Sequence, residues 1–226
     1  MKYDVHFKSK GWRPVLMKKM NKLLIGEDFK SILDVGGTQN TYDYLKEKFP
    51  NSKVISINLD PEELPKENAM IMNAEDMGKF EDNMFDFLYV REVLEHIYRP
   101  DKFLEEAKRV LKPGGKIMVS TPNLNSWHVR FLILFGYPPT NYTPYPGKVY
   151  GKPRFFKTQP HIDHVRVFPY RTMKKIFDMN GFKLDGIVGV SMYSEDTWMK
   201  SFRKIIGAIL PNSWQEGILV KATVSK

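Results

Sequence analysis

Hydrophobic and polar positions follow two periods along the chain. Short apolar runs rich in Val, Ile, Leu and Phe predict buried strands, at 31–35, 53–58, 69–72, 85–90, 116–120, 182–190 and 217–224. Apolar residues three and four positions apart predict helices, at 12–25, 41–48, 101–111, 126–135, 170–180 and 197–210. Because strands and helices alternate with short connections, the pattern predicts an α/β fold whose parallel sheet is covered by helices on both faces.

The alternation stops between residues 124 and 168. Six prolines and four tyrosines fall in this segment. A connection of this length inside a compact domain is usually functional or disordered, and the aromatic content argues against disorder. We therefore expect one domain over residues 1–226, divided into a basic helical extension (1–30), a core (31–123), a substrate lid (124–168), and C-terminal helices and strands (169–226).

The composition is ordinary for a globular protein and excludes some chemistry. The chain has 226 residues, of which 42% are hydrophobic and 27% are charged, and it contains no cysteine. Disulfides and thiolate catalysis are therefore excluded. No apolar run reaches the length of about 18 residues that a membrane span needs, and no secretory signal is evident at the amino terminus. These features predict a cytoplasmic protein without a transmembrane segment.

The net charge of +9 is spread unevenly along the chain. Residues 1–30 carry a net charge of +5, residues 31–123 carry −5 and residues 124–226 carry +9. Basic flanks suit an anionic partner, such as a phosphorylated small molecule, a nucleic acid or a lipid headgroup. The alternative is a basic surface that serves solubility alone.

Polar residues and glycines follow four of the predicted strands. The four segments are Asp34-Val35-Gly36-Gly37-Thr38, Asn58-Leu59-Asp60, Asn73-Ala74-Glu75-Asp76 and Arg91-Glu92-Val93-Leu94-Glu95-His96. In an open parallel sheet, ligands bind outside the carboxyl ends of the strands, at the switch in strand order. The four segments therefore predict one site at that edge of the sheet.

From about Ser31 to Asn123, these segments resemble the class I S-adenosylmethionine-dependent methyltransferases. Residues 161–182 continue the resemblance more loosely, and the last predicted strand matches the antiparallel last strand of that family. The resemblance implies a Rossmann-like three-layer α/β/α sandwich around a seven-stranded, mostly parallel sheet, with a lid inserted. It also implies S-adenosylmethionine as the cofactor and transfer of its methyl group to a hydroxyl or an amine.

The family's cofactor contacts can be carried onto this chain residue by residue. The resemblance implies that the methionine end lies at Asp34, Gly36 and Gly37, the ribose at Asn58 and Leu59, the adenine at Asn73, Ala74 and Glu75, and the sulfonium near the Arg91 backbone. Two departures stand out. The turn after Gly37 lacks the family's third glycine, and Asn58 replaces an acidic residue, whose charged hydrogen bonds to hydroxyls would be stronger.

Glu92, Glu95 and His96 stand at spacings that share one face of a helix, and their side chains suit a divalent ion. The same Glu-x-x-Glu-His occurs in ubiquinone-biosynthesis O-methyltransferases and in small-RNA 3′-terminal 2′-O-methyltransferases. Resemblance to both implies Mg²⁺ on these three side chains, and the RNA enzymes add a later histidine, for which His161 or His164 would be the counterpart. In the alternative, the residues support the loop, or His96 faces the substrate as a base.

A hydroxyl acceptor needs a base or a metal, and the candidate bases are His96 and His164, with His161 behind them. Three hypotheses follow. The first is a methyltransferase for an anionic small molecule or glycan intermediate. The second is a metal-dependent RNA 2′-O-methyltransferase. The third is a non-catalytic module that binds S-adenosylmethionine or a protein partner.

Overall fold

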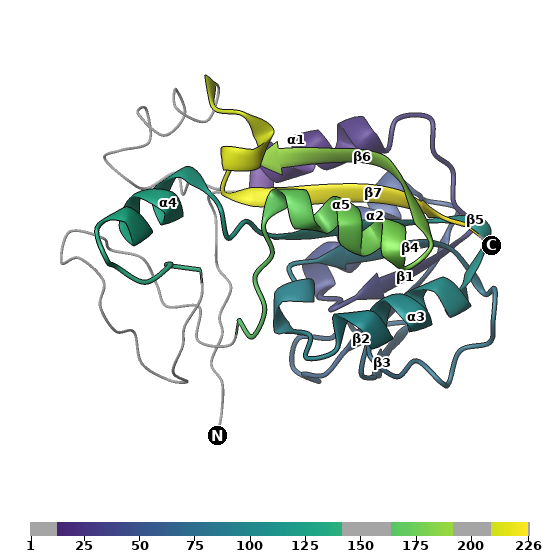
Figure 1. Ribbon diagram of the computed structural model, residues 1–226. Coiled ribbons are helices and arrows are strands. Elements are labelled where there is room, and N and C mark those ends of the chain that lie inside the picture. Colours follow the sequence, from purple (N-terminus) through teal and green to yellow (C-terminus); the bar gives the residue numbers. More distant parts are fainter. Residues whose placement is uncertain (1–12, 142–163, 192–208, 226) are drawn as a thin grey trace.

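The computed structural model describes residues 13–141, 164–191 and 209–225 (Figure 1). The structure does not describe residues 142–163 of the predicted lid, which include His161, or the predicted helix at 197–210 except its end. Within the described residues, seven strands form one sheet in the order β3-β2-β1-β4-β5-β7-β6. They are β1 (Ser31–Val35), β2 (Lys53–Asn58), β3 (Ala69–Ile71), β4 (Phe85–Arg91), β5 (Leu111–Pro122), β6 (Phe182–Val190) and β7 (Gly217–Val224).

The strand directions confirm the predicted fold class. Strands β1 to β5 pair in parallel, whereas β7 pairs antiparallel with both of its neighbours, β5 and β6. The strand order reverses at β1 and β4, which lie side by side in the middle of the sheet. The loops that leave the carboxyl ends of these two strands therefore border the position where an open α/β sheet binds its ligand.

Helices cover both faces of this sheet (Figure 1). The described helices are α1 (Arg13–Leu23), α2 (Gln39–Lys48), α3 (Pro100–Val110), α4 (Trp127–Leu134) and α5 (Tyr170–Met179), with short 3₁₀ turns η1 (Leu94–His96) and η2 (Asn212–Trp214). One core packs α3 and α5 against the sheet, and the other packs α1 and α2 against its opposite face. Among the described residues, no helix has both the length and the apolar character that a membrane crossing requires.

Side chains alternate between the two cores along β4. Phe87 and Tyr89 point into the core under α1 and α2, whereas Leu88 and Val90 point into the core under α3 and α5. All four are fully buried, as expected for a strand covered on both faces. Phe87 also stacks on Phe29, with ring centroids 4.4 Å apart. This packing fixes the end of β4, from which the candidate site begins.

Strand β5 is longer than predicted. It pairs first through Leu111, opposite Phe85, and then resumes at Lys116, opposite Phe87. Residues 112–115, between these two positions, form a loop that leaves the pairing, and Gly114 in this loop has φ 73°. Helix α3 therefore ends at Val110 and the chain enters the sheet immediately, whereas the sequence predicted a helix through residue 111 and a strand only from residue 116.

Candidate functional site

The Gly36-Gly37 turn leaves the end of β1. Both backbone N–H groups donate to the Ile57 carbonyl oxygen, at 2.8 and 2.9 Å. A Cβ atom on Gly36 would lie 2.2 Å from Cγ2 of Val93, and one on Gly37 would lie 2.5 Å from Cβ of Ser56. Since no real Cβ approaches another atom so closely, the packing of the chain itself requires glycine at both positions.

Thr38 explains why the turn lacks a third glycine. It is the N-cap of α2, where its side chain accepts from the Thr41 N–H and the Thr41 hydroxyl accepts from the Thr38 N–H. This reciprocal cap satisfies two backbone donors that a helix start would otherwise leave without partners. The chain passes from the turn straight into a capped helix, so the departure from the family pattern does not disturb the local fold.

Asp34 ends β1 as a buried carboxylate. Its Oδ2 accepts from the Thr41 hydroxyl at 2.6 Å and from the Ser56 hydroxyl at 3.2 Å. Its Oδ1 is buried and has no hydrogen-bond partner among the described residues. Burial raises the pKa of Asp34 to about 7, against the opposing effect of the two hydroxyl donors. A buried acceptor without a partner is costly, and a donor on a bound ligand would relieve that cost.

Asn58 ends β2 and ties two loops together. Its Nδ2 donates to the Gly37 carbonyl at 3.1 Å, and its Oδ1 accepts from the Asp60 N–H at 3.1 Å. An aspartate there would lose the donor to Gly37, which gives this position a structural reason for an amide. Leu59 beside it is 67% exposed.

The segment after β3 closes the same edge of the sheet. Asn73 Oδ1 accepts from the Glu75 N–H at 2.9 Å, and Ala74 is buried. Glu75 Oε1 accepts from the Tyr98 N–H at 2.9 Å, just beyond η1. The structure therefore brings all four predicted strand ends to one edge of the sheet.

At the end of β4, the predicted helical face is wrong. Glu92 has φ 55°, in the left-handed region, and only Leu94–His96 form a turn of 3₁₀ helix. The chain therefore changes direction at Glu92 before the helical turn begins. Glu92 bonds instead to β5: its N–H donates to the Ser120 carbonyl at 3.0 Å, and its Oε1 accepts from the Ser120 hydroxyl at 2.7 Å.

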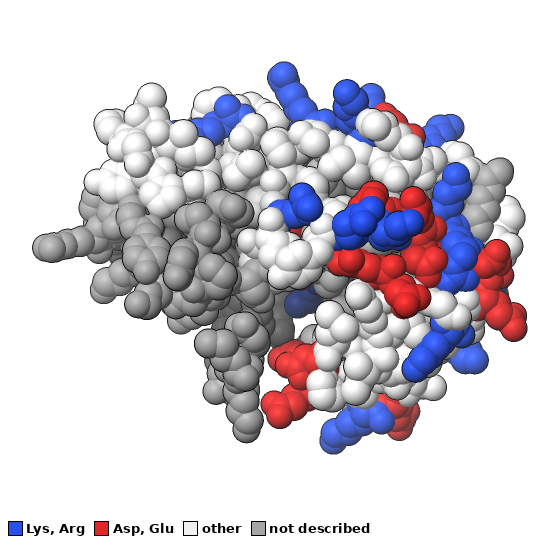
Figure 2. Space-filling model, turned by 60° about the horizontal axis from the view of Figure 1, so that its bottom comes forward, with Lys and Arg blue, Asp and Glu red and all other residues white. Residues whose placement is uncertain are grey.

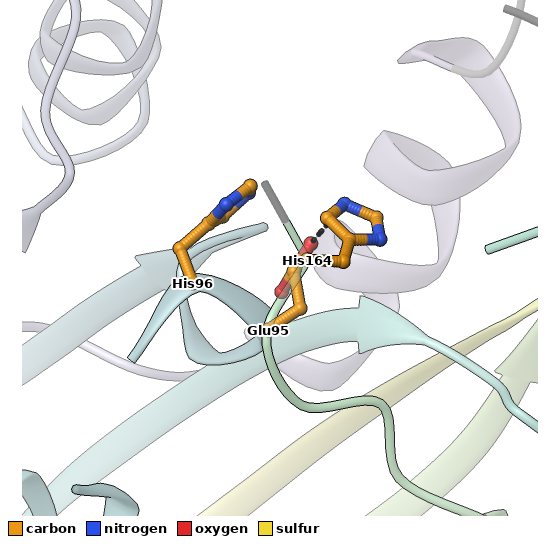
Figure 3. Close-up of side chains that lie close together, drawn as sticks. All are labelled: Glu95, His96 and His164. Carbon is orange, nitrogen blue, oxygen red and sulfur yellow. Dashed lines mark ion pairs between the residues drawn. The ribbon is translucent and has the colours of Figure 1, made fainter. Parts of the chain in front are cut away.

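Glu95, His96 and His164 form the compact cluster of the site (Figure 3). Each offers one atom that could bind a metal ion, and these three atoms lie within 4.8 Å of one another. Glu95 Oε1 lies 3.9 Å from His164 Nε2, and the two histidine ring centroids are 4.9 Å apart. The structure thus adds His164 to the group with Glu95 and His96, while the Glu92 side chain contacts Glu95 from the end of β4.

His164 is held in one orientation by the backbone around it. Its Nδ1 lies 2.8 Å from the Asn141 carbonyl oxygen, which can only accept, so Nδ1 carries the proton. In the neutral ring, Nε2 then carries the lone pair, and it faces Glu95. The next two N–H groups, of Val165 and Arg166, donate to the Glu95 carbonyl at 2.9 and 3.1 Å. These hydrogen bonds attach the end of the predicted lid segment to η1.

The two glutamates are buried and close enough to influence each other's titration. Burial raises the pKa of Glu92 to about 7. Burial, followed by the charge of Glu92, raises the pKa of Glu95 well above its ordinary value. The Thr121 hydroxyl donates to Glu95 Oε2 at 3.0 Å. Two carboxylates in this setting favour a shared proton or a neighbouring cation.

Four supporting residues were missed by the sequence reasoning. Ser120 and Thr121, at the end of β5, donate to the two glutamates. Their place in Ser-Thr-Pro-Asn, after an apolar run, is a signal that could have revealed them. Asn141 has a buried Oδ1 without a partner among the described residues, and Ser56 supports Asp34. Nothing in the sequence near these two residues marks them.

Residues 33–119 match the sequence family described as Methyltransferase domain. This part of the chain is similar to the methyltransferase domains of that family. The match confirms the class of enzyme predicted for it, an S-adenosylmethionine-dependent methyltransferase.

Curated relatives match the methyltransferase domain over short stretches. The uncharacterized protein MJ1123 of Methanocaldococcus jannaschii is 45% identical over 59 residues, which are 26% of this chain and 28% of that protein. The ubiquinone biosynthesis O-methyltransferase of Hydrogenovibrio crunogenus is 26% identical over 42% of this chain and 38% of its own length. The chloroplastic tocopherol O-methyltransferase of Arabidopsis thaliana is 32% identical over 41% of this chain and 30% of its own length. The chain thus spans well under half the length of these relatives.

Solved structures share the fold over almost the whole chain. The putative methyltransferase in complex with the Trm112 activator of Haloferax volcanii has a TM-score of 0.63 at 14% identity, over 94% of this chain and 90% of that one. The 1,6-didemethyltoxoflavin-N1-methyltransferase of Burkholderia thailandensis has a TM-score of 0.60 at 15% identity, over 99% and 82%. At these identities the likeness establishes the fold alone.

Proposed function

We propose that this chain transfers a methyl group from S-adenosylmethionine to a hydroxyl or amine of an anionic small molecule or glycan intermediate. The observation that carries the proposal is the cluster of Glu95, His96 and His164, beside the strand-end turn that resembles the family's cofactor loop. The family match to residues 33–119 supports the reaction class. The basic net charge of +9 supports an anionic acceptor.

The residues at the end of β1 fit the cofactor. Asp34 keeps one buried oxygen for a ligand donor, and the Gly36 and Gly37 turn has no side chain that could block it. In this proposal, these three residues hold the methionine end, and Arg91 contributes its backbone near the sulfonium. Asn58 and Leu59 border the ribose, and Asn73, Ala74 and Glu75 border the adenine. The cofactor, when bound, supplies the activated methyl group.

The histidines would remove the acceptor's proton. His164 presents the lone pair of Nε2 while the Asn141 carbonyl holds its Nδ1–H. Glu95, 3.9 Å from Nε2, stabilises the imidazolium that forms. His96 stands on the other side of the same space and is the second candidate base. His161, outside the described residues, stays a candidate on the sequence alone.

Calorimetry with S-adenosylmethionine and S-adenosylhomocysteine tests the cofactor assignment. We expect saturable binding of both ligands, with a dissociation constant in the micromolar range. No heat of binding at millimolar ligand would reject the methyltransferase proposal. Binding without methyl transfer to any acceptor in a panel of hydroxyl and amine compounds would favour the non-catalytic module.

The donor set also supports a second candidate function, a metal-dependent RNA 2′-O-methyltransferase. One carboxylate and two imidazoles within 4.8 Å of one another suit a divalent ion such as Mg²⁺ or Mn²⁺. Such an ion would lower the pKa of a substrate hydroxyl and replace the base. This candidate predicts activity that EDTA abolishes and Mg²⁺ restores, together with RNA binding that weakens steeply with salt. Activity on a small acceptor, unchanged by EDTA, would reject it.

A further inference from the structure

Helix α4 is apolar on the side that faces solvent as well as on the side that is buried. Val129 and Leu132 are buried. Phe131, Leu134 and Phe135, which share the opposite face at spacings of three and four, are 52%, 79% and 60% exposed. An ordinary surface helix turns polar residues to the solvent, so this outward face needs another explanation.

The apolar surface extends beyond that face. Ile133 and Tyr137 are 53% and 38% exposed, and Trp214 in η2 is 40% exposed. The guanidinium of Arg130 lies over the Trp214 ring, 4.7 Å from its centroid, which joins η2 to α4. We call these residues the α4 patch: Phe131, Ile133, Leu134, Phe135, Tyr137 and Trp214.

The α4 patch lies away from the charged surface of the molecule. Figure 1 shows α4 beyond the carboxyl ends of the parallel strands, apart from both helix layers. In Figure 2, the charged side chains of the described residues that are in view gather on the right. An exposed apolar surface of this kind marks a docking site.

We propose that the α4 patch docks onto an anionic lipid surface. The charge of the adjoining sequence argues for this occupant. In the sequence, residues 142–163 follow α4 after a connection of seven residues, and they contain Lys148, Lys152, Arg154 and Lys157, against one acidic residue, Asp163. Apolar and aromatic side chains next to basic residues are the composition of segments that lie in the headgroup region of anionic membranes.

The shape of the patch argues for lipid rather than for a protein groove. A groove takes one stripe of a helix, whereas Ile133 lies on a different side of α4 from Phe131 and Leu134. Exposed aromatic side chains at the rim, Tyr137 and Trp214, suit the membrane–water interface, where one part of the ring is apolar and the other is wet. This docking surface is independent of the proposed methyl transfer.

Vesicle sedimentation tests the proposal with the full-length protein. The probes are vesicles of phosphatidylglycerol and phosphatidylcholine in equal parts, and vesicles of phosphatidylcholine alone. The variant is Leu134→Asp, and the matched control is Met179→Asp, because Met179 on α5 is 75% exposed and Leu134 is 79% exposed. Both substitutions add the same charge at an exposed apolar position, so circular dichroism should give the same melting curve as the parent protein.

We expect the parent protein and Met179→Asp to sediment with the anionic vesicles, and Leu134→Asp to bind them at least about tenfold more weakly. Binding by the parent should fall as salt rises. Failure of the parent to bind anionic vesicles, or equal loss in both variants, would overturn the proposal. A dimer in light scattering that Leu134→Asp disrupts, with no vesicle binding, would also overturn it and would identify a second copy as the occupant.

Discussion

Two regions meet at the carboxyl edge of the sheet, and they are built differently. Around Asp34, nearly every polar atom bonds to a neighbour from the same stretch of chain, between Asp34 and Asp60. Around Glu95, the key atoms come from η1, β5 and the segment at His164, and Glu95 Oε1 lies 3.9 Å from His164 Nε2. The first region is thus assembled from residues close together in the sequence, whereas the second is assembled from three distant segments.

Replacing His164 with alanine should show most clearly that the region around Glu95 serves turnover and the region around Asp34 serves cofactor binding. Loss of the proposed base should lower kcat by about 100- to 1000-fold. The dissociation constant for S-adenosylhomocysteine should change less than about twofold, since the Asp34 region is untouched. Stopped assays with a methyl-labelled cofactor and calorimetry measure the two quantities.

Arg166→Ala is the control for that substitution, because Arg166 lies in the same segment and its side chain bonds only to the Tyr98 carbonyl among the described residues. It should retain activity within about threefold. If His164→Ala instead weakened the cofactor as strongly as it slowed turnover, the division into two regions would be wrong.

Asp34→Asn should have the next largest effect, on binding. An amide keeps an acceptor for Thr41 and Ser56 but loses the charge, so we expect cofactor affinity to fall by about 10- to 100-fold. Turnover at saturating cofactor should change far less. Calorimetry on the variant and the parent measures the affinity, and an unchanged dissociation constant would remove Asp34 from the cofactor site.

The same substitution has a pH signature. The pKa of Asp34 is raised from 3.8 to about 7 in the folded protein, so the folded state binds more protons than the unfolded state between these values. The stability contributed by protonated Asp34 is therefore present at low pH and is lost as pH rises from about 4 to 7. This loss amounts to about 4 kcal/mol. Asp34→Asn should flatten that part of the stability–pH curve in urea unfolding, and an unchanged slope would contradict the prediction.

Gly37→Ala should act through packing. The new Cβ would lie 2.5 Å from Ser56 Cβ and 2.7 Å from Asp34 Oδ2, so we expect a loss of about 1–3 kcal/mol in the free energy of unfolding. Gly78→Ala is the control, since its Cβ would meet only the flexible Asp76 Oδ1 at 3.2 Å. Urea unfolding compares the two, and equal stability would mean that the turn can relax.

Asn58→Ala should have the smallest effect of the series. The amide holds Gly37 and Asp60 in place, so its removal should cost about 0.5–1.5 kcal/mol, shared between stability and cofactor affinity. Thermal unfolding with and without S-adenosylhomocysteine separates the two shares. A loss of affinity above about 30-fold would instead assign Asn58 a direct and dominant role at the ribose.

The region around Asp34 could be predicted from the sequence, because its hydrogen bonds join residues that are close together in the chain. The periods of apolar residues gave β1, β2, β6 and β7 with the bounds that the structure has. The strand-end rule then placed Asp34, Asn58 and Glu95 at one edge. The role of Asn58 in bonding Gly37 required the coordinates, because that bond depends on how two loops from different strands approach each other.

The cluster could be predicted only in part. A helical spacing suggested Glu92 beside Glu95, and their side chains do meet, but not on one helical face, because the left-handed conformation of Glu92 turns the chain before the helical turn begins. His164 lies far from Glu95 in the sequence, and hydrogen bonds from Val165 and Arg166 to the Glu95 carbonyl bring it there. Contacts between segments so distant in the chain leave no periodic pattern in the sequence.

The strand order has a consequence for how the protein is made. Strand β7 follows β6 in the chain but lies between β5 and β6 in the sheet, so β6 has no partner strand until β7 has been synthesised. On the ribosome, β1 to β5 can pair as they emerge, while β6 and its apolar face must wait for the last strand.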